Sequence, residues 1–158
     1  MNNQYELQNL ARIEIEKMTK KITLLLNKYY HKPFVLESRI KDINKLRMQQ
    51  ELYSKRYGYN VSLDELPDIV GFRISVENDS EVIFLGSIIK NFLEPNRFVD
   101  YFSNPKESGF KALIYYFKEN NINVEIQVMT IEKMYFTNAT QKKHDEIKYA
   151  KILKKSII

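Results

Sequence analysis

Residues 121–128 alternate between apolar and polar side chains, and this alternation is the strongest constraint on the fold. Each even position is isoleucine or valine, whereas Glu125 and Gln127 occupy odd positions. Because successive side chains of a β-strand point to opposite faces, one face of this strand packs in a core and the other carries a carboxylate and an amide. The apolar run 110–117 and the turn residues 119–121 before it predict a hairpin. A site and a solvated sheet face explain the polar positions equally well.

Helices alternate with the strands in the predicted arrangement. Apolar residues spaced three and four apart form one stripe of a first helix, which Pro33 ends, and Ser80 is the expected N-cap of a later helix. The expected helices are 5–30, 43–56, 81–92 and one from 131 onward. The expected strands are 69–76, 98–102, 110–117 and 121–128, and a further short extended segment carries Arg39 and Lys41. The sequence therefore predicts one α+β domain over residues 1–158, with a mixed sheet of about five strands and an N-terminal helix within residues 1–32.

Composition narrows the class of function. The net charge of +5 suits an anionic partner such as nucleotide phosphates or RNA. Cysteine is absent, which excludes disulfides, thiolate nucleophiles and Cys-ligated zinc. No apolar run reaches the roughly 18 residues that span a membrane, and no signal peptide is visible, so we expect a cytoplasmic protein without a membrane partner.

Two acids and three cations form the first group of candidate site residues. Asp68 lies at the entrance of the strand 69–76, where it can meet Glu125, and two converging carboxylates can hold Mg²⁺ with a bound triphosphate. Arg39 and Lys41 are two residues apart in an extended segment, so both can point at one ligand. Arg73 lies within a strand, where an arginine needs an anionic or aromatic partner. Surface charges, or an internal salt bridge for Arg73, are the structural alternatives.

The loop before Phe110 is a second candidate site. Gly109 permits a backbone turn that other residues resist, and Lys106 places a positive charge beside it. Phe110 offers a flat ring on which a base can stack, although it could also begin a core strand.

In this order, these segments resemble the synthetase domain of the RelA/SpoT family over residues 36–150. This family transfers pyrophosphate from ATP to a ribose 3′-hydroxyl, on a nucleotidyltransferase-like fold. The resemblance implies that Asp68 and Glu125 are the catalytic acids and bind Mg²⁺, with Glu125 also assisting deprotonation of the attacking hydroxyl. It further implies that Arg39 and Arg73 flank the adenine of ATP.

The resemblance also implies roles in phosphate and acceptor binding. Lys41 contacts phosphate, and Lys45 on the following helix is a further candidate for ATP binding. On the acceptor side, the ring of Phe110 stacks on the guanine of GDP or GTP. Lys106, Gly109 and Gln127 complete that half of the site.

Departures from the family pattern leave the function open. Ile114 and Met129 stand where the family usually has histidine and arginine, and His144 is the only candidate for a histidine further along the chain. The main expectation is a small alarmone synthetase that uses GDP or GTP. A tRNA 3′ end, as in the toxic small synthetases, is a second acceptor, and the tail lysines within 151–155 would suit it. The alternative is a catalytically weak or inactive module on the same fold that binds nucleotide, RNA or protein. A homo-oligomer or an antitoxin is the expected protein partner.

Overall fold

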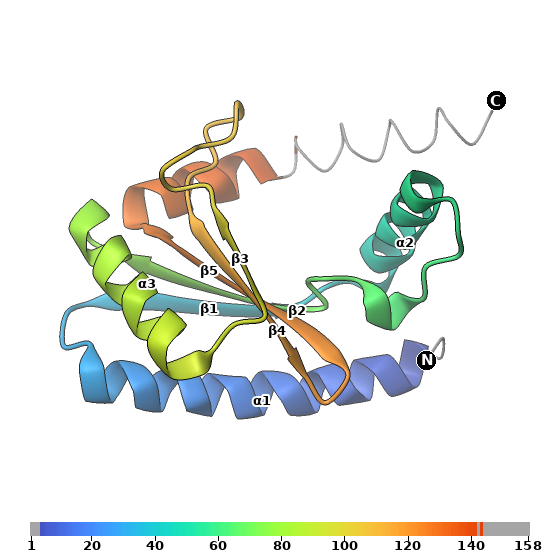
Figure 1. Cartoon of the computed structure of the whole chain (residues 1–158), viewed down its shortest axis with the longest axis horizontal. Helices are drawn as coiled ribbons and strands as arrows, with labels where there is room; N and C mark the ends of the chain where they lie inside the picture. The colour runs from blue at the N-terminus through green and yellow to red at the C-terminus, as the bar shows by residue number, and fades with distance from the viewer. Residues whose placement is uncertain (1–3, 142, 144–158) are drawn as a thin grey trace.

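A five-stranded mixed sheet forms the centre of the molecule in the computed structural model, which describes residues 4–141 and 143. Its spatial order is β1-β2-β5-β4-β3 (Figure 1). Only β2 and β5 pair in parallel, and the three other pairings are antiparallel. The strands are β1 (Phe34–Ile40), β2 (Val70–Val76), β3 (Arg97–Asp100), β4 (Leu113–Glu119) and β5 (Ile122–Thr130). The predicted α+β fold with a mixed sheet of five strands is confirmed.

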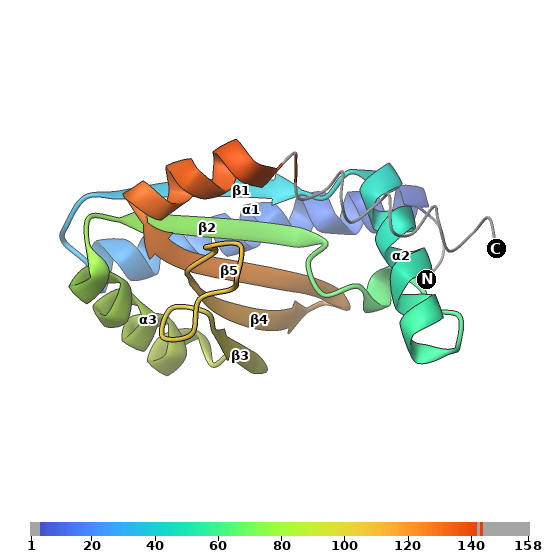
Figure 2. The same ribbon diagram turned by 90° about the horizontal axis from the view of Figure 1, so that it is seen from above.

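Helices cover the two faces of this sheet unequally. The long helix α1 (Gln4–Tyr29) and α3 (Asp79–Leu93) lie on one face, and the helical residues 131–141 lie on the other (Figures 1 and 2). The helix α2 (Ile43–Tyr57) and the short helix η1 (Leu63–Glu65) stand at one end of the sheet. The polar face is therefore bordered by residues 131–141, by the loop between β3 and β4, and by α2.

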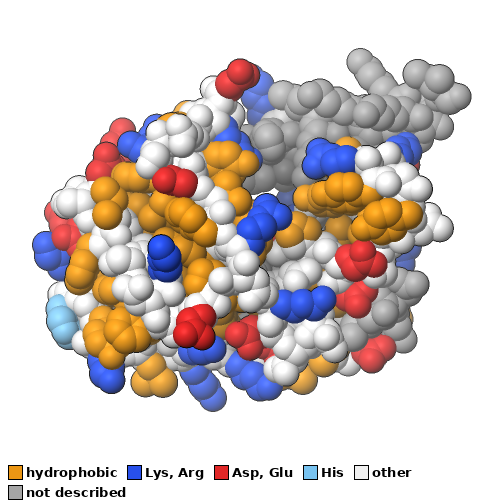
Figure 3. Space-filling view, viewed as in Figure 1, with side chains coloured by type: hydrophobic (Ala, Val, Ile, Leu, Met, Phe, Trp, Pro, Cys, Tyr) orange, Lys and Arg blue, Asp and Glu red, His pale blue; other side chains and the backbone are white. Residues whose placement is uncertain are grey.

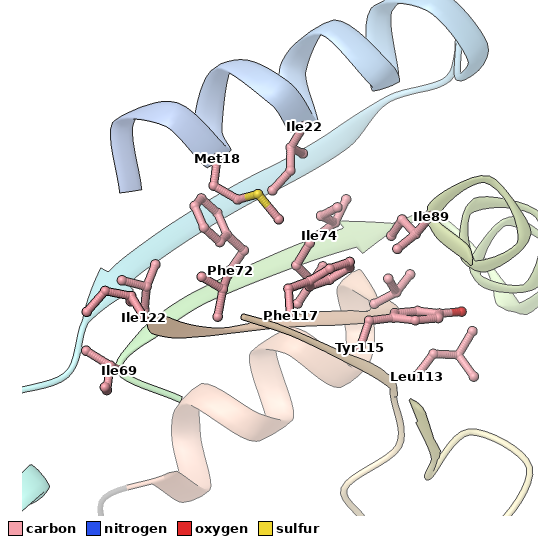
Figure 4. Packing of buried hydrophobic residues seen from close by; sticks show 14 of the residues in the cluster. Met18, Ile22, Ile69, Phe72, Ile74, Ile89, Leu113, Tyr115, Phe117 and Ile122 are labelled. Carbon is pink, nitrogen blue, oxygen red and sulfur yellow. The ribbon is translucent and has the colours of Figure 1, made fainter. Parts of the chain in front are cut away.

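The apolar face of the sheet carries the main core. The four even positions from 122 to 128 of β5 are fully buried, as predicted. They belong to a cluster that Met18 and Ile22 of α1 and Ile89 of α3 cover (Figure 4). Each fully buried Ile, Leu or Phe contributes roughly 1.5–3 kcal/mol relative to its exposed state. This packing fixes the sheet as a rigid platform, so side chains on its other face are held in place.

The hairpin between β4 and β5 forms the predicted tight turn. Asn120 and Asn121 both adopt positive φ, at 49° and 65°. Asparagine tolerates this left-handed region, and two such residues in succession make the turn whose twist matches antiparallel strands. The turn sets the register of the hairpin, and it thereby decides which β4 residues face Glu125.

Three predicted boundaries were wrong. The N-cap of α3 is Asn78, whose Oδ1 accepts from the backbone N–H of Glu81 at 3.1 Å, while the Ser80 hydroxyl also donates to it. The strand expected at 98–102 ends at Asp100, because its carboxylate accepts from the backbone N–H groups of residues 102 and 103 and turns the chain. The strand expected from residue 110 begins at Leu113.

The outer face of α3 is unusually apolar. Ile83, Phe84 and Phe92 are each at least half exposed, and Figure 3 shows hydrophobic side chains gathered over this helix. Such patches often mark protein–protein contacts, so this face is where the expected oligomer or protein partner would bind. No helix within the described residues is long and apolar enough to cross a membrane. His144 and the tail lysines lie outside the described residues.

Candidate functional site

Two rows of residues cross the polar face of all five strands. Residues opposite one another in register share a face, so the side chains of each row are neighbours. The rows are Arg39-Gly71-Glu125-Tyr116-Arg97 and Glu37-Arg73-Gln127-Ile114-Val99. The register thus brings together three residues from distant parts of the chain that the sequence singled out: Arg39, Arg73 and Glu125.

Asp68 lies just before β2 and is held by three side chains. Lys41 Nζ donates to its Oδ2 at 2.5 Å, and Gln49 Nε2 donates to its Oδ1 at 3.1 Å. The guanidinium of Arg39 lies 3.8 Å from Oδ2. Asp68 is buried, as is most of the Lys41 side chain. The predicted neighbours Arg39 and Lys41 therefore do converge, and in this structure they converge on an acid.

Opposite electrostatic environments surround the two acids. Burial alone would raise the pKa of Asp68, but the charge and hydrogen bond of Lys41, with Arg39 and Gln49, hold that pKa below its usual value. Burial, followed by the negative charge of Asp68, raises the pKa of Glu125. Asp68 is thus ionised at neutral pH, whereas Glu125 binds a proton more readily than an exposed glutamate does.

The pair of acids has the chemistry of a magnesium site. Carboxylate oxygens are ligands that Mg²⁺ prefers. The negative charges of Asp68 and Glu125 repel each other, and a bound divalent cation would balance that repulsion. Within the described part of the chain, no group of three or more His, Cys, Asp or Glu residues could hold a metal. Two protein carboxylates leave the other positions to water or to phosphate oxygens.

Gln127 connects the acid to the second arginine. Its Nε2 donates to Glu125 Oε1 at 2.5 Å, and its Oε1 accepts from Arg73 Nε at 3.0 Å. Arg73 also donates from Nη1 to Asn138 Oδ1 at 2.6 Å, so the helical residues 131–141 help to orient it. Burial lowers the pKa of Arg73, although arginine stays charged at any physiological pH. Gln127 was assigned to the acceptor side, and here it lies between Glu125 and Arg73.

A pocket of about 200 Å³ lies over this part of the sheet, with Arg39, Arg73, Glu125 and Gln127 among its lining residues. Gly71 forms its floor. Arg39 lies across β2 here, and even an added Cβ at position 71 would only make ordinary van der Waals contact with it, at 3.4 Å from Nε. Pockets for whole ligands usually measure roughly 300–1,000 Å³, so this one has room for a part such as a flat base.

The loop before β4 lies at the other end of the polar face. Lys106 Nζ stands over the rings of Tyr101 and Phe110, at 4.6 and 5.3 Å from their centroids. Phe110 is half-buried against a small cluster that includes Met129 and Ala112. Gly109 has φ +90°, and an added Cβ would lie 3.1 Å from the ring of Phe136. The loop thus requires glycine at 109 and presents part of an aromatic ring.

The remaining predicted positions are placed as follows. Lys45 lies in α2 one turn before Gln49, and its side chain is half-buried. Ile114 is 4% exposed and lies opposite Gln127. Met129 is fully buried with Ala112 and Met134. The positions where the family usually has histidine and arginine are thus apolar and closed.

Sequence reasoning missed Gln49, Tyr116 and Asn138. For Tyr116 a signal was present: a two-residue turn at 120 and 121 places residue 116 opposite residue 125. Burial and the charge of Glu125 raise the pKa of the Tyr116 hydroxyl, and a hydrogen bond to Glu125 adds to this effect. Gln49 and Asn138 contact residues far away in the sequence, and no local pattern marks them.

A mixed sheet with acids and arginines on one face defines a candidate nucleotide site. The family model for the "Region found in RelA / SpoT proteins" matches residues 38–152, so the chain belongs to the RelA/SpoT family. It is 32% identical over 84 residues to the probable chloroplastic GTP diphosphokinase RSH3 of Arabidopsis thaliana. The rice counterpart is 29% identical over 84 residues. In both cases the match covers 51% of this chain but only 12% of the relative.

Solved structures share the fold over 83–98% of this chain. The small alarmone synthetase 1 of Bacillus subtilis bound to its product pppGpp has a TM-score of 0.67 at 16% identity, covering 90% of this chain and 83% of that one. A GTP pyrophosphokinase family protein of Streptococcus pneumoniae has a TM-score of 0.66 at 20% identity, covering 98% and 90%. The complex of the Type VI effector Tas1 with its immunity protein gives 0.60 at 18% identity, covering 83% and 63%. At these identities the likeness concerns the fold.

Proposed function

We propose that this protein is a pyrophosphokinase that transfers pyrophosphate from ATP to a ribose 3′-hydroxyl. The acceptor oxygen forms a bond to the β-phosphorus of ATP, the bond between this phosphorus and the α–β bridging oxygen breaks, and AMP leaves. The observation that carries the proposal is the alignment of Arg39, Arg73 and Glu125 on one face of the sheet, with Asp68 beside them. Family membership and the names of the curated relatives support it.

The donor half of the site lies over β1 and β2. The adenine of ATP would occupy the pocket between Arg39 and Arg73, because guanidinium groups stack on flat rings. Lys41 would exchange its contact with Asp68 for a phosphate oxygen, and Lys45 is the next cation along α2. Asp68 and Glu125 would hold Mg²⁺, which neutralises phosphate charge when bound.

Glu125 has a second task at the acceptor hydroxyl. Its raised pKa makes it a better proton acceptor than an ordinary glutamate, and Gln127 fixes its orientation through the hydrogen bond at 2.5 Å. The carboxylate would take the proton of the 3′-hydroxyl as the oxygen attacks. Catalysis by this site would come mainly from positioning and charge neutralisation, as in phosphoryl transfer generally.

A guanine nucleotide, GDP or GTP, is the default acceptor. Its base would stack on the part of the Phe110 ring that remains accessible, with Lys106 and Gly109 shaping the loop. A tRNA 3′ end is the other acceptor, which the net charge of +5 favours.

A non-catalytic nucleotide-binding module is the second candidate function. Ile114 and Met129 favour it, because apolar, closed side chains at these positions remove two polar groups from the acceptor half. The two intact acids argue against it.

Label transfer from ATP distinguishes these functions. ATP labelled at its β and γ phosphates is incubated with Mg²⁺ and, in separate reactions, with GDP, GTP or bulk tRNA. We expect label on one acceptor with the parent protein, and at least about 100-fold less with Glu125→Gln. The variant Arg12→Ala, an exposed cation on α1, is the matched control and should transfer normally. ATP binding without transfer to any acceptor supports the binding module, and absence of ATP binding overturns both proposals.

A further inference from the structure

Arg97 occupies the far end of the row that contains Glu125. Two strand spacings separate Arg97 on β3 from Glu125 on β5, and two separate Arg39 on β1 from the same glutamate. With strands about 4.8 Å apart, the backbone of each arginine lies about 10 Å from that of Glu125. The row therefore ends in an arginine on each side of Glu125.

The ring of Tyr116 orients Arg97. The Arg97 guanidinium carbon lies 4.5 Å from the ring centroid of Tyr116, which is itself the cross-strand neighbour of Glu125. The Arg97 side chain is exposed, and among residues 4–141 no carboxylate forms an ion pair with it. A guanidinium stacked on a ring keeps the N–H groups at its edge available for an anion.

The cations near Arg97 differ in their surroundings. Lys111 is paired with Asp79 at 3.4 Å and stands over the ring of Phe102. Lys118 is exposed and lies on β4 opposite Asn123, one position further from Phe110 on the same face than Tyr116. Arg97 differs from these lysines because the ring it stacks on, Tyr116, lies directly opposite Glu125.

We propose that Arg97 binds a phosphate group of the acceptor, while Tyr116 holds its guanidinium in place. This inference rests on the proposed function. If the donor nucleotide lies over β1 and β2, the phosphates of the acceptor must lie on the opposite side of Glu125, over β4 and β3. A nucleotide whose base contacts Phe110 and whose ribose reaches Glu125 can then direct its 5′-phosphates to Arg97.

Comparison of ligands with and without phosphate tests this role. Calorimetry measures the binding of guanosine, GMP and GDP to the parent protein and to Arg97→Ala, Arg97→Lys and Arg12→Ala. We expect the parent to bind GDP at least about 10-fold more tightly than guanosine, as charge-assisted hydrogen bonds allow. Arg97→Ala should lose this preference without weakening guanosine, Arg97→Lys should keep part of it, and Arg12→Ala should match the parent. Tyr116→Phe should keep the preference, because the ring remains.

Two results would overturn the inference even if label transfer succeeds. One is an Arg97→Ala variant that still prefers GDP to guanosine. The other is an equal loss for both ligands, which indicates that Arg97 only supports the local structure. If no guanine compound binds the parent, the same variants are titrated with bulk tRNA over a range of salt concentrations. Loss of one phosphate contact should then reduce the salt slope by about one, and an unchanged slope overturns the inference.

Discussion

Replacing Asp68 with asparagine should weaken the fold as well as abolish transfer. Asp68 is buried, and its Oδ2 lies 2.5 Å from Lys41 Nζ. At an effective dielectric constant of about 20, two unit charges at that distance attract by roughly 7 kcal/mol, most of which desolvation cancels. Removing one partner leaves a buried, unpaired ammonium and typically costs about 3–5 kcal/mol. Because Lys41 keeps its hydrogen bond to Gln49 at 2.8 Å, we expect a loss of about 2–3 kcal/mol.

Urea and thermal unfolding of the parent and Asp68→Asn measure this loss. For a chain of this size, about 2–3 kcal/mol corresponds to a fall in Tm of about 4–12 °C. Asp42→Asn is the matched control, since Asp42 is exposed and caps α2, a position where asparagine serves equally well. Its free energy of unfolding should change by less than about 0.5 kcal/mol.

The pH dependence provides an independent check. The pKa of Asp68 lies below its usual value of about 3.9, so its ionised form stabilises the folded state. That contribution is complete above the unfolded pKa and is lost as the pH falls through the folded pKa. The stability difference between the parent and Asp68→Asn should therefore be constant from about pH 5 to 7 and shrink below about pH 4. A difference under about 1 kcal/mol at pH 7, or one that persists at the lowest pH, would refute the reasoning.

Three further predictions follow from the site. Glu125→Gln should lower transfer at least about 100-fold. Its stability should equal or exceed the parent's, increasingly so as the pH rises through the raised pKa of Glu125, and a destabilised variant in urea would contradict this. Arg39→Ala should weaken ATP binding about 10-fold in calorimetry with little change in Tm, because 48% of its side chain is exposed; equal affinity would make Arg39 a surface charge. Gly109→Ala should cost about 1–3 kcal/mol in urea unfolding, because of its φ of +90° and the ring of Phe136, and an unchanged midpoint would contradict that account.

Elements with strong local periodicity could be predicted from the sequence. The alternation of 121–128 became β5, the apolar stripe became α1, and the asparagines at 120 and 121 made the expected turn. In each case the pattern and the local backbone preference point to the same structure, so tertiary contacts reinforce the local preference. The end of the strand at Asp100 was not predicted, because it depends on the Asp100 carboxylate accepting hydrogen bonds from two backbone N–H groups.

The polar contacts of the candidate site depend on long-range pairing. Gln49 and Asp68 are 19 residues apart, and Arg73 and Gln127 are 54 apart. The sequence marked Asp68 and Arg73 as candidate site residues, but it could not show which neutral side chains hold them. The amide groups of Gln49 and Gln127 carry no charge pattern, and only the packing of α2 and the parallel pairing of β2 with β5 place them.

The last strand of the described sheet in chain order, β5, lies in its middle, between β2 and β4. During synthesis, β1 with β2 and β3 with β4 can form only as separate antiparallel pairs, because β5 supplies all the hydrogen bonds that join them. Such late, non-local pairing makes sheet assembly slow compared with the formation of helices. A ribosome-bound chain therefore has no joined row of Arg39, Glu125 and Arg97 until β5 has emerged, so the candidate site is assembled only late in synthesis.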